Sequence, residues 1–220
     1  MSAASAVRPV PEQDLDEPVS YGLSLANLPL PVTIHPARPL TDEELLRFCE
    51  ENDGVEIESD ADGSITVMTP AWAETSWLNQ LFSAELTVWA RLSGQGVVFG
   101  PDLGVRFPDK VLRGPDVAWL TRERWNAVRK LKKKDRGFLK FCPEFVAEIR
   151  SENDSASKVE AKMEFWMARG AQLGWLIDPK RKLAMIYRPG QEPETLLRPE
   201  FLEGDGPLAG FRLEMREFWG

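Results

Sequence analysis

Residues 143–178 constrain the fold most, because they combine strand, helix and strand patterns with two charges at positions expected to be buried. The run Phe145-Val146-Ala147 is typical of a buried strand, and Glu148 follows it directly. The next helix carries apolar residues that fall within about 60° of one another at 100° per residue, namely Val159, Met163 and Trp166. Lys162 lies beside Trp166 on that inward face. A carboxylate and an ammonium directed at one sheet–helix junction indicate a functional site.

Length and composition predict one globular domain with an N-terminal extension. A chain of 220 residues with 43% apolar residues is long enough for one sizeable core. We expect a proline-rich, partly disordered arm over residues 1–39, with residues 1–20 without structure, and a single domain over residues 40–220. We expect no membrane span and no signal peptide, since the sequence has no apolar run of the required length.

Cysteine and histidine usage narrows the chemistry. Two cysteines are too few for a disulfide framework or a zinc site, which favours a reduced, cytoplasmic compartment. The single histidine, His35, lies in the proline-rich segment and argues against histidine-based catalysis.

Charge is unevenly distributed along the chain. The net charge is −8, which is not typical of a nucleic-acid-binding protein. Between Arg122 and Lys140, however, nine basic residues stand against two acidic ones. This segment is either a solvated surface or a phosphate-binding patch near the site. The second interpretation assigns nucleic-acid contacts to Lys130, Lys132, Lys133 and Lys134.

The remaining patterns predict helices and strands in alternation. Thr41 and Glu44 form a capping-box pattern that opens a helix through about Glu51. Strands are expected near residues 55–57, 65–67, 97–99, 103–107, 117–120, 183–187, 195–197 and within 208–218. A long helix is expected over residues 73–92, with Trp77, Leu81, Leu86 and Trp89 buried, and a crossover helix from Asp154 or Ser155 to Gly170. The order predicts an α+β fold with a mixed β-sheet flanked by helices.

Three residues then align as a constellation: Asp116 at the start of a strand, Glu148 near the end of another, and Lys162 on the crossover helix. Carboxylates bind Mg²⁺, which polarises a phosphoryl oxygen and lowers the pKa of a bound water. A nearby lysine orients that water or stabilises the developing charge. Arg150 shares a strand face with Glu148 and is expected to point towards the same phosphate. The alternative is an internal ion pair of Glu148 with Lys162 or Arg150, beside a turn-forming Asp116.

The motifs GPDVAWL, CPEFVAEIRSENDS, KMEFWMARGAQLGWLIDP, IYRP and LAGFRLEM occur in this order. In this combination the chain resembles the bacterial family called Uma, described as "putative restriction endonuclease" and abundant in cyanobacteria, from about Leu40 to the C-terminus. That family belongs to the PD-(D/E)XK nuclease superfamily. The resemblance implies a restriction-endonuclease-like fold and a metal-dependent endonuclease that hydrolyses phosphodiester bonds of DNA.

The resemblance also implies residue roles. Pro115-Asp116 matches the PD motif, Glu148 matches the second acidic position, and the backbone carbonyl of Ile149 completes the shell of a Mg²⁺ ion that Mn²⁺ replaces. Arg150 stands where the superfamily pattern has lysine, and Lys162 on the following helix supplies the lysine instead. Glu74 matches an accessory acidic position, although an exposed helix-start glutamate explains it equally well.

Two other functions remain open at this point. The acidic net charge and Arg150 in the lysine position favour a catalytically inactive nuclease fold that binds nucleic acid or protein. A structural, dimer-forming protein is the third possibility. For an active enzyme with one site per chain, a homodimer is expected, because cutting both strands of DNA favours two-fold symmetry.

Overall fold

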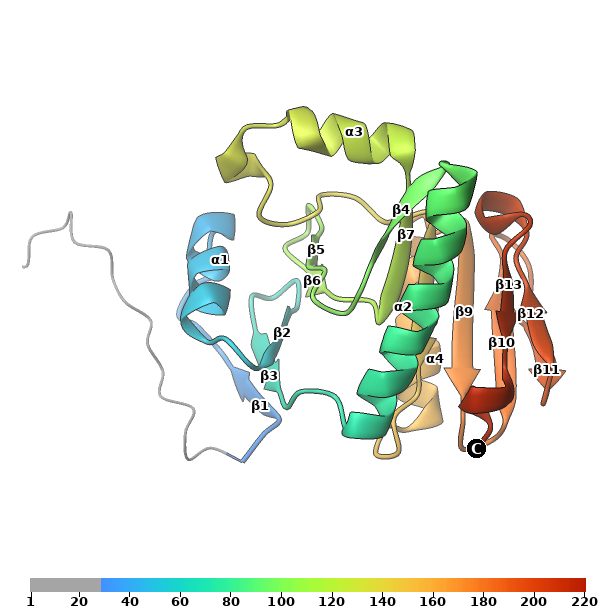
Figure 1. Ribbon diagram of the computed structural model, residues 1–220. Helices are drawn as coiled ribbons and strands as arrows, with labels where there is room; N and C mark the ends of the chain where they lie inside the picture. Colours follow the sequence, from blue (N-terminus) through green and yellow to red (C-terminus); the bar gives the residue numbers. More distant parts are fainter. Residues whose placement is uncertain (1–28) are drawn as a thin grey trace, which may run out of the picture.

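Two β-sheets packed side by side frame the structure, a computed structural model that describes residues 29–220 (Figure 1). The five-stranded sheet has the order β1-β3-β2-β6-β5, and its strands are β1 (Val32–Ile34), β2 (Glu56–Ser59), β3 (Ile65–Met68), β5 (Val105–Arg106) and β6 (Leu112–Arg113). The six-stranded sheet has the order β11-β10-β9-β8-β7-β4, and its strands are β4 (Gly96–Phe99), β7 (Val117–Thr121), β8 (Phe145–Ile149), β9 (Leu173–Asp178), β10 (Leu183–Tyr187) and β11 (Glu194–Leu197). A hairpin of β12 (Phe201–Glu203) and β13 (Arg212–Glu214) completes the strands.

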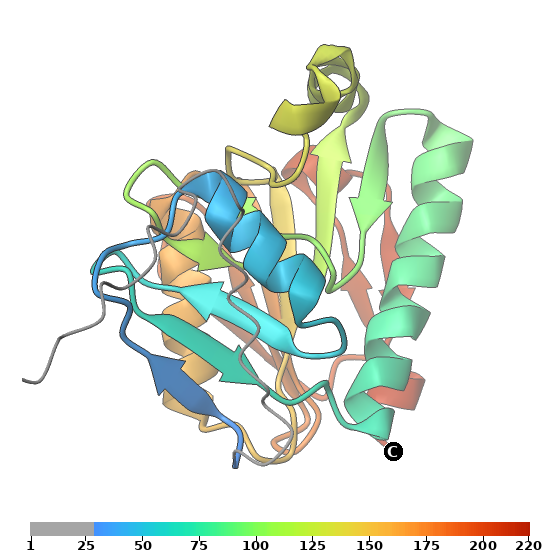
Figure 2. The same cartoon turned by 90° about the vertical axis from the view of Figure 1, so that its left-hand side faces the viewer.

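Within residues 29–220, four α-helices accompany these sheets: α1 (Asp42–Glu51), α2 (Ala73–Ser93), α3 (Arg122–Lys130) and α4 (Ala156–Ala168). The same part of the chain contains three short 3₁₀ helices: η1 (Lys133–Asp135), η2 (Gly206–Leu208) and η3 (Arg216–Phe218). Figure 2 shows α1 in blue over the five-stranded sheet, with α2 in green to one side. None of the helices between residues 29 and 220 combines the length and apolar character that a membrane crossing requires.

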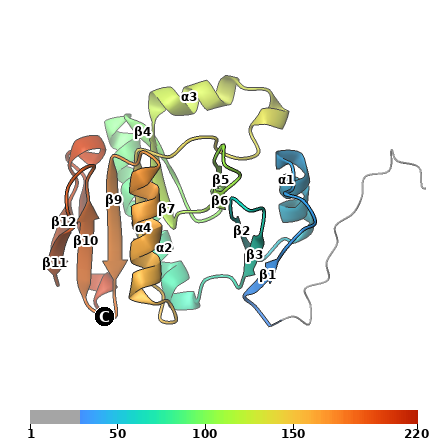
Figure 3. The same ribbon diagram turned by 180° about the vertical axis from the view of Figure 1, so that it is seen from behind.

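The six-stranded sheet is mixed, as the sequence predicts. β8 and β9 run parallel, and α4 connects them, because a parallel pair needs a crossover connection. The other neighbouring pairs in this sheet are antiparallel. Figure 3 shows α4 lying along one face of the sheet, with α2 behind it. The predicted α+β fold with a mixed sheet flanked by helices is therefore confirmed.

Alternation along β8 divides its side chains between two cores. Phe145, Ala147 and Ile149 belong to the apolar cluster that includes α2 residues such as Phe82. Val146 belongs to the other cluster, which contains the α4 residues Val159, Met163 and Trp166. Because side chains alternate with a period of two, Glu148 lies on the Val146 face and points towards α4.

Local sequence signals explain where the helices begin and end. Thr41 caps α1 in the predicted capping box with Glu44, whose side chain accepts a hydrogen bond from the Thr41 amide. Ser155 caps α4 by accepting a hydrogen bond from the Lys158 amide. α2 ends at Gly94, which adopts the left-handed conformation with φ of 68° that glycine tolerates.

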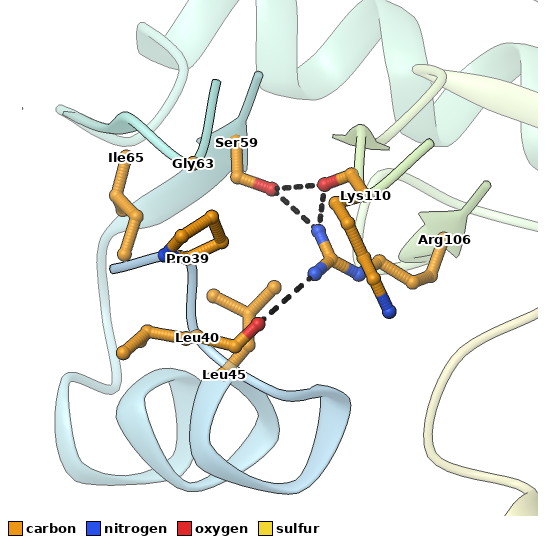
Figure 4. Close-up of a pocket in the computed structure, with 8 residues that line it drawn as sticks. All are labelled: Pro39, Leu40, Leu45, Ser59, Gly63, Ile65, Arg106 and Lys110. Carbon is orange, nitrogen blue, oxygen red and sulfur yellow. Dashed lines mark hydrogen bonds between the residues drawn. The ribbon is translucent and has the colours of Figure 1, made fainter. Parts of the chain in front are cut away.

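Arg106 connects the five-stranded sheet to the neighbouring segments (Figure 4). Its side chain is only 3% exposed. The guanidinium donates to Asp42 Oδ1 at 2.9 Å, to Ser59 Oγ at 2.8 Å and to the backbone carbonyls of Lys110 and Leu40. These partners come from the start of α1, from β2 and from the β5–β6 turn, so one buried cation joins three segments.

Some expectations differ from the structure. Trp77 is 49% exposed on α2, contrary to the predicted burial, because Leu78 and Phe82 occupy the inward face. The strand expected over residues 103–107 is reduced to β5, and β1, β6, β12 and α3 were not expected. Within the predicted arm, β1 pairs with β3, so residues 32–34 belong to the sheet. The prediction for residues 1–20 lies outside the described residues.

Candidate active site

The antiparallel pairing of β7 with β8 brings Asp116 and Glu148 together. Val117 pairs with Ala147, so Asp116, one residue earlier, lies across from Glu148, one residue later. Asp116 Oδ2 accepts a hydrogen bond of 2.7 Å from the backbone amide of Ile149. Two carboxylates about thirty residues apart in sequence therefore meet at one end of a strand pair.

Glu148 is buried and both of its carboxylate oxygens have partners from α4. Its side chain is 3% exposed. Oε1 accepts a hydrogen bond of 2.6 Å from Trp166 Nε1, and Oε2 lies 3.0 Å from Lys162 Nζ. Lys162 and Trp166 are one helical turn apart, so both reach the same carboxylate. The sequence-based placement of Lys162 against Glu148 agrees with this geometry.

Burial and the neighbouring charges shift the pKa values of all three groups. Burial raises the pKa of Glu148 to about 8, although the Lys162 ammonium opposes the shift, and the nearby Asp116 adds to it. Burial likewise raises the pKa of Asp116 against the effect of Lys162. For Lys162, burial lowers the pKa, but the carboxylates of Glu148, Glu58 and Asp116 outweigh it and raise the pKa above its ordinary value. Lys162 therefore stays protonated, and a proton added to the cluster binds to one of the carboxylates.

Three side chains that the sequence analysis missed also line the cluster. Glu58 of β2 lies 3.7 Å from Lys162 Nζ. Glu56, two residues earlier on the same face of β2, has a pKa raised by burial and by Asp116. Asn79 of α2 donates to Asp116 Oδ1 at 3.4 Å. The two acidic residues alternate with Val55 and Ile57, which was the only signal for them in the sequence.

Arg150 does not join the cluster. Its guanidinium donates to Asp178 Oδ2 at 2.9 Å and to the backbone carbonyl of Asp154 at 2.9 Å. Asp178 is fully buried at the end of β9. Arg150 follows the last residue of β8, so the alternation that directs Glu148 towards α4 no longer applies to it. The expectation that Arg150 points towards the same phosphate as Glu148 therefore disagrees with this geometry.

The other predicted residues lie away from Asp116 and Glu148. Glu74 is exposed in the first turn of α2, and the contact of this helix with Asp116 is made by Asn79 instead. The basic segment follows β7 and includes α3 and η1, with Lys130, Lys132 and Lys133 exposed and Lys134 within η1. Asp116 precedes β7, so the five residues of this strand, about 17 Å, separate it from the basic segment. Figure 1 shows α3 at the far end of β7, which contradicts a basic patch near the site.

The donor set suits a hard divalent cation that keeps water in its shell. Among residues 29–220, no group of three or more His, Cys, Asp and Glu side chains is arranged as a metal cage. Magnesium, however, is usually held by one or two carboxylates together with waters and phosphate. Asn79 Oδ1 is buried and has no hydrogen-bond partner within the described part of the chain. An orphaned oxygen next to Asp116 is a suitable acceptor for a metal-bound water.

Fold and site together define an α+β domain with a mixed sheet and an Asp–Glu–Lys cluster, in which the lysine comes from the crossover helix. The family profile of Uma2, described as "Putative restriction endonuclease", matches residues 42–216, and the chain belongs to this family. The family resemblance inferred from the motifs is thereby confirmed.

Among solved structures, the chain is similar to a protein of Anabaena variabilis ATCC 29413, described as a putative nuclease belonging to DUF820. The two share 21% sequence identity with a TM-score of 0.66, over 82% of this chain and 98% of the other. At this identity the likeness establishes the fold. No curated protein matches the chain.

Proposed function

We propose that the protein is a metal-dependent endonuclease that hydrolyses phosphodiester bonds of DNA. The observation that carries the proposal is the 3.0 Å contact between Lys162 Nζ and Glu148 Oε2. Asp116 lies beside this pair and accepts a hydrogen bond from the backbone amide of Ile149. Membership of a family described as "Putative restriction endonuclease" supports the same reaction class. An ion pair that served stability alone would not require a second carboxylate and an orphaned Asn79 oxygen at the same place.

Each residue has a distinct role in this proposal. Asp116, Glu148 and the backbone carbonyl of Ile149 would hold Mg²⁺, with Mn²⁺ as a substitute. The bound ion would supply Lewis acidity to the phosphoryl oxygen and to a water. Lys162 keeps its proton because of the surrounding carboxylates, so it orients the attacking water by donating a hydrogen bond and stabilises negative charge on the phosphate. Trp166 holds Glu148 in one orientation through its indole N–H.

The basic segment supports DNA as substrate in a different way from the one expected. Its exposed lysines lie at the far end of β7 from Asp116, so they would contact backbone phosphates remote from the scissile bond. Such contacts add affinity without sequence information. Cutting both strands with one site per chain would require two copies of the protein on one duplex.

The test is cleavage of supercoiled plasmid DNA with Mg²⁺ or Mn²⁺. We expect nicked or linear product from the wild type, and a loss of at least about 100-fold in rate for Asp116→Ala, Glu148→Ala and Lys162→Ala, as is typical when a catalytic group is removed. Arg150→Lys serves as a control for a residue near β8 but outside the cluster. Cleavage that all three alanine substitutions leave unchanged would overturn the mechanism.

A binding module without turnover is the second candidate, because both oxygens of Glu148 are already satisfied by Trp166 and Lys162. A self-contained pair of this kind is compatible with a purely structural role. Metal binding separates the two functions. The binding module would be supported if Mg²⁺ and Mn²⁺ leave the melting temperature of the wild type unchanged while the protein still binds DNA at low salt.

A further inference from the structure

Lys162 lies between two carboxylates that come from different sheets. Its Nζ is 3.0 Å from Glu148 Oε2 and 3.7 Å from Glu58 Oε1. Glu148 belongs to β8 of the six-stranded sheet, and Glu58 belongs to β2 of the five-stranded sheet. The ammonium therefore connects the two sheets across the cluster, with Glu58 as a second anion within reach.

Glu58 is held in place independently of Lys162. Its Oε2 lies 3.4 Å from Arg113 Nε, and Arg113 in turn donates to the Ser59 carbonyl at 2.8 Å and contacts Asp60. The next residue, Ser59, is fixed by the buried Arg106 at 2.8 Å. Both oxygens of Glu58 thus face cations, so its surroundings suit an acceptor for an ammonium better than a ligand for a metal ion.

Metal binding at Glu148 creates a need for such an acceptor. Lys162 contacts Oε2 and Trp166 contacts Oε1, so a divalent cation that binds Oε2 repels the ammonium next to it. Moving an ammonium away from its closest anion in a partly buried site is costly unless another anion receives it. A shortening of the Glu58 contact from 3.7 Å to about 2.9 Å gives a charge-assisted hydrogen bond.

We propose that Glu58 is a positioning residue that receives the Lys162 ammonium when Glu148 takes up a divalent ion. The inference rests on the proposed function, since it presumes a metal site at Asp116 and Glu148. Glu58 lowers the cost of separating Lys162 from Glu148 and keeps the ammonium next to the cluster. From this position the ammonium can still donate a hydrogen bond to the attacking water or to a phosphoryl oxygen.

The test is a double-mutant cycle read by Mn²⁺ affinity without nucleic acid. Isothermal titration calorimetry compares the full-length wild type, Glu58→Gln, Lys162→Met and the double variant. We expect Glu58→Gln to weaken Mn²⁺ binding about tenfold in the wild-type background, within the range found for residues in contact. In the Lys162→Met background the same substitution should change affinity by less than about twofold, because the ammonium that Glu58 receives is gone.

Glu56→Gln is the matched control, since it removes the same charge from the same face of β2. Within residues 29–220, Glu56 forms no ion pair with Lys162, although the Lys162 ammonium acts on its carboxyl at longer range. The effect of Glu56→Gln on Mn²⁺ affinity should therefore differ less between the two backgrounds than the effect of Glu58→Gln. If Glu58→Gln fails to fold, as judged by thermal unfolding, Glu58→Asp replaces it, with weaker Mn²⁺ binding expected only when Lys162 is present.

Two results overturn the inference alone. The first is an equal loss of Mn²⁺ affinity on Glu58→Gln in both backgrounds, which would mean that Glu58 binds the metal itself or attracts it through its charge. The second is no loss of Mn²⁺ affinity on Glu58→Gln in the wild type. Absence of Mn²⁺ binding by the wild type overturns the proposed metal site together with the inference. In a DNA-cleavage assay with saturating Mn²⁺, Glu58→Gln should lower kcat and leave KM unchanged. A change in KM alone would contradict a role in positioning Lys162.

Discussion

Replacing Glu148 with glutamine should reduce the pH dependence of stability between pH 5 and pH 8. Glu148 is 3% exposed, and burial raises the pKa of its carboxyl from 4.5 to about 8. The folded protein therefore retains a proton that the unfolded chain releases above about pH 4.5. Glutamine has nearly the same shape and no proton to release, so it lacks this dependence.

The sign and size follow from proton linkage. A carboxyl whose pKa is raised on folding contributes stability that is fully present below its unfolded pKa and is lost as the pH rises through the folded pKa. The slope for one such group reaches about 1.4 kcal/mol per pH unit, so pH 5 to 8 corresponds to at most about 4 kcal/mol.

The other shifted carboxyls fall into two groups. The pKa values of Asp42, Asp109 and Asp178 are lowered, so their contributions are lost only as the pH falls below the ordinary range of aspartate. The pKa values of Asp116 and Glu56 are raised, so these groups act in the same direction as Glu148. They should leave a residual slope in the Glu148→Gln variant.

The measurement is urea unfolding at pH 5, 6, 7 and 8, followed by tryptophan fluorescence. The wild type should lose stability steadily towards pH 8, and Glu148→Gln should show a flatter profile. Glu152→Gln is the control, because Glu152 is 62% exposed and pairs with Lys180 at the surface. A flat wild-type profile, or a Glu148→Gln profile parallel to the wild type, would refute the reasoning.

Three further predictions concern the metal, Arg150 and the basic segment. Mn²⁺ at 100 times its Kd should stabilise the wild type by about 2.7 kcal/mol, seen as a higher Tm, and Asp116→Asn should abolish the rise; an equal rise in the variant would contradict the assignment. Arg150→Ala should cost about 2 kcal/mol in urea unfolding, because the fully buried Asp178 loses one guanidinium partner and keeps Arg181, yet leave Mn²⁺ affinity within about twofold; the opposite pattern would place Arg150 in the site. Replacing three exposed lysines with alanine should lower the slope of log K against log salt for DNA binding by about 3, and an unchanged slope would exclude phosphate contacts by Lys130, Lys132 and Lys133.

Helical phase and strand alternation were sufficient to predict the contact between Glu148 and Lys162. Both periodicities are local, so a buried strand and an amphipathic helix determine which side chains face each other. The capping signals at Thr41 and Ser155 fixed helix starts to within a residue or two for the same reason. The PD motif needed the family resemblance, because nothing local pairs Asp116 with a residue thirty positions later.

Contacts between the two sheets could not be predicted from the sequence. Glu58 reaches Lys162 because the β2–β3 hairpin packs beside α4, and hairpin patterns do not encode which element they meet. Arg150 was expected in the site from alternation alone, but β8 ends at Ile149 and a fully buried Asp178 attracts the guanidinium. Trp77 was expected to be buried because the tryptophans mostly fall on periodic apolar faces, although a helix against one sheet face buries only part of its surface.

The most direct test of the account is a crystal structure of the protein soaked with Mn²⁺ and recorded at a wavelength where manganese scatters anomalously. The account predicts a single anomalous peak between the carboxylates of Asp116 and Glu148, with Lys162 moved from Glu148 to Glu58. Density without such a peak at a Mn²⁺ concentration that saturates DNA cleavage, with Lys162 still on Glu148, would contradict the proposed metal site.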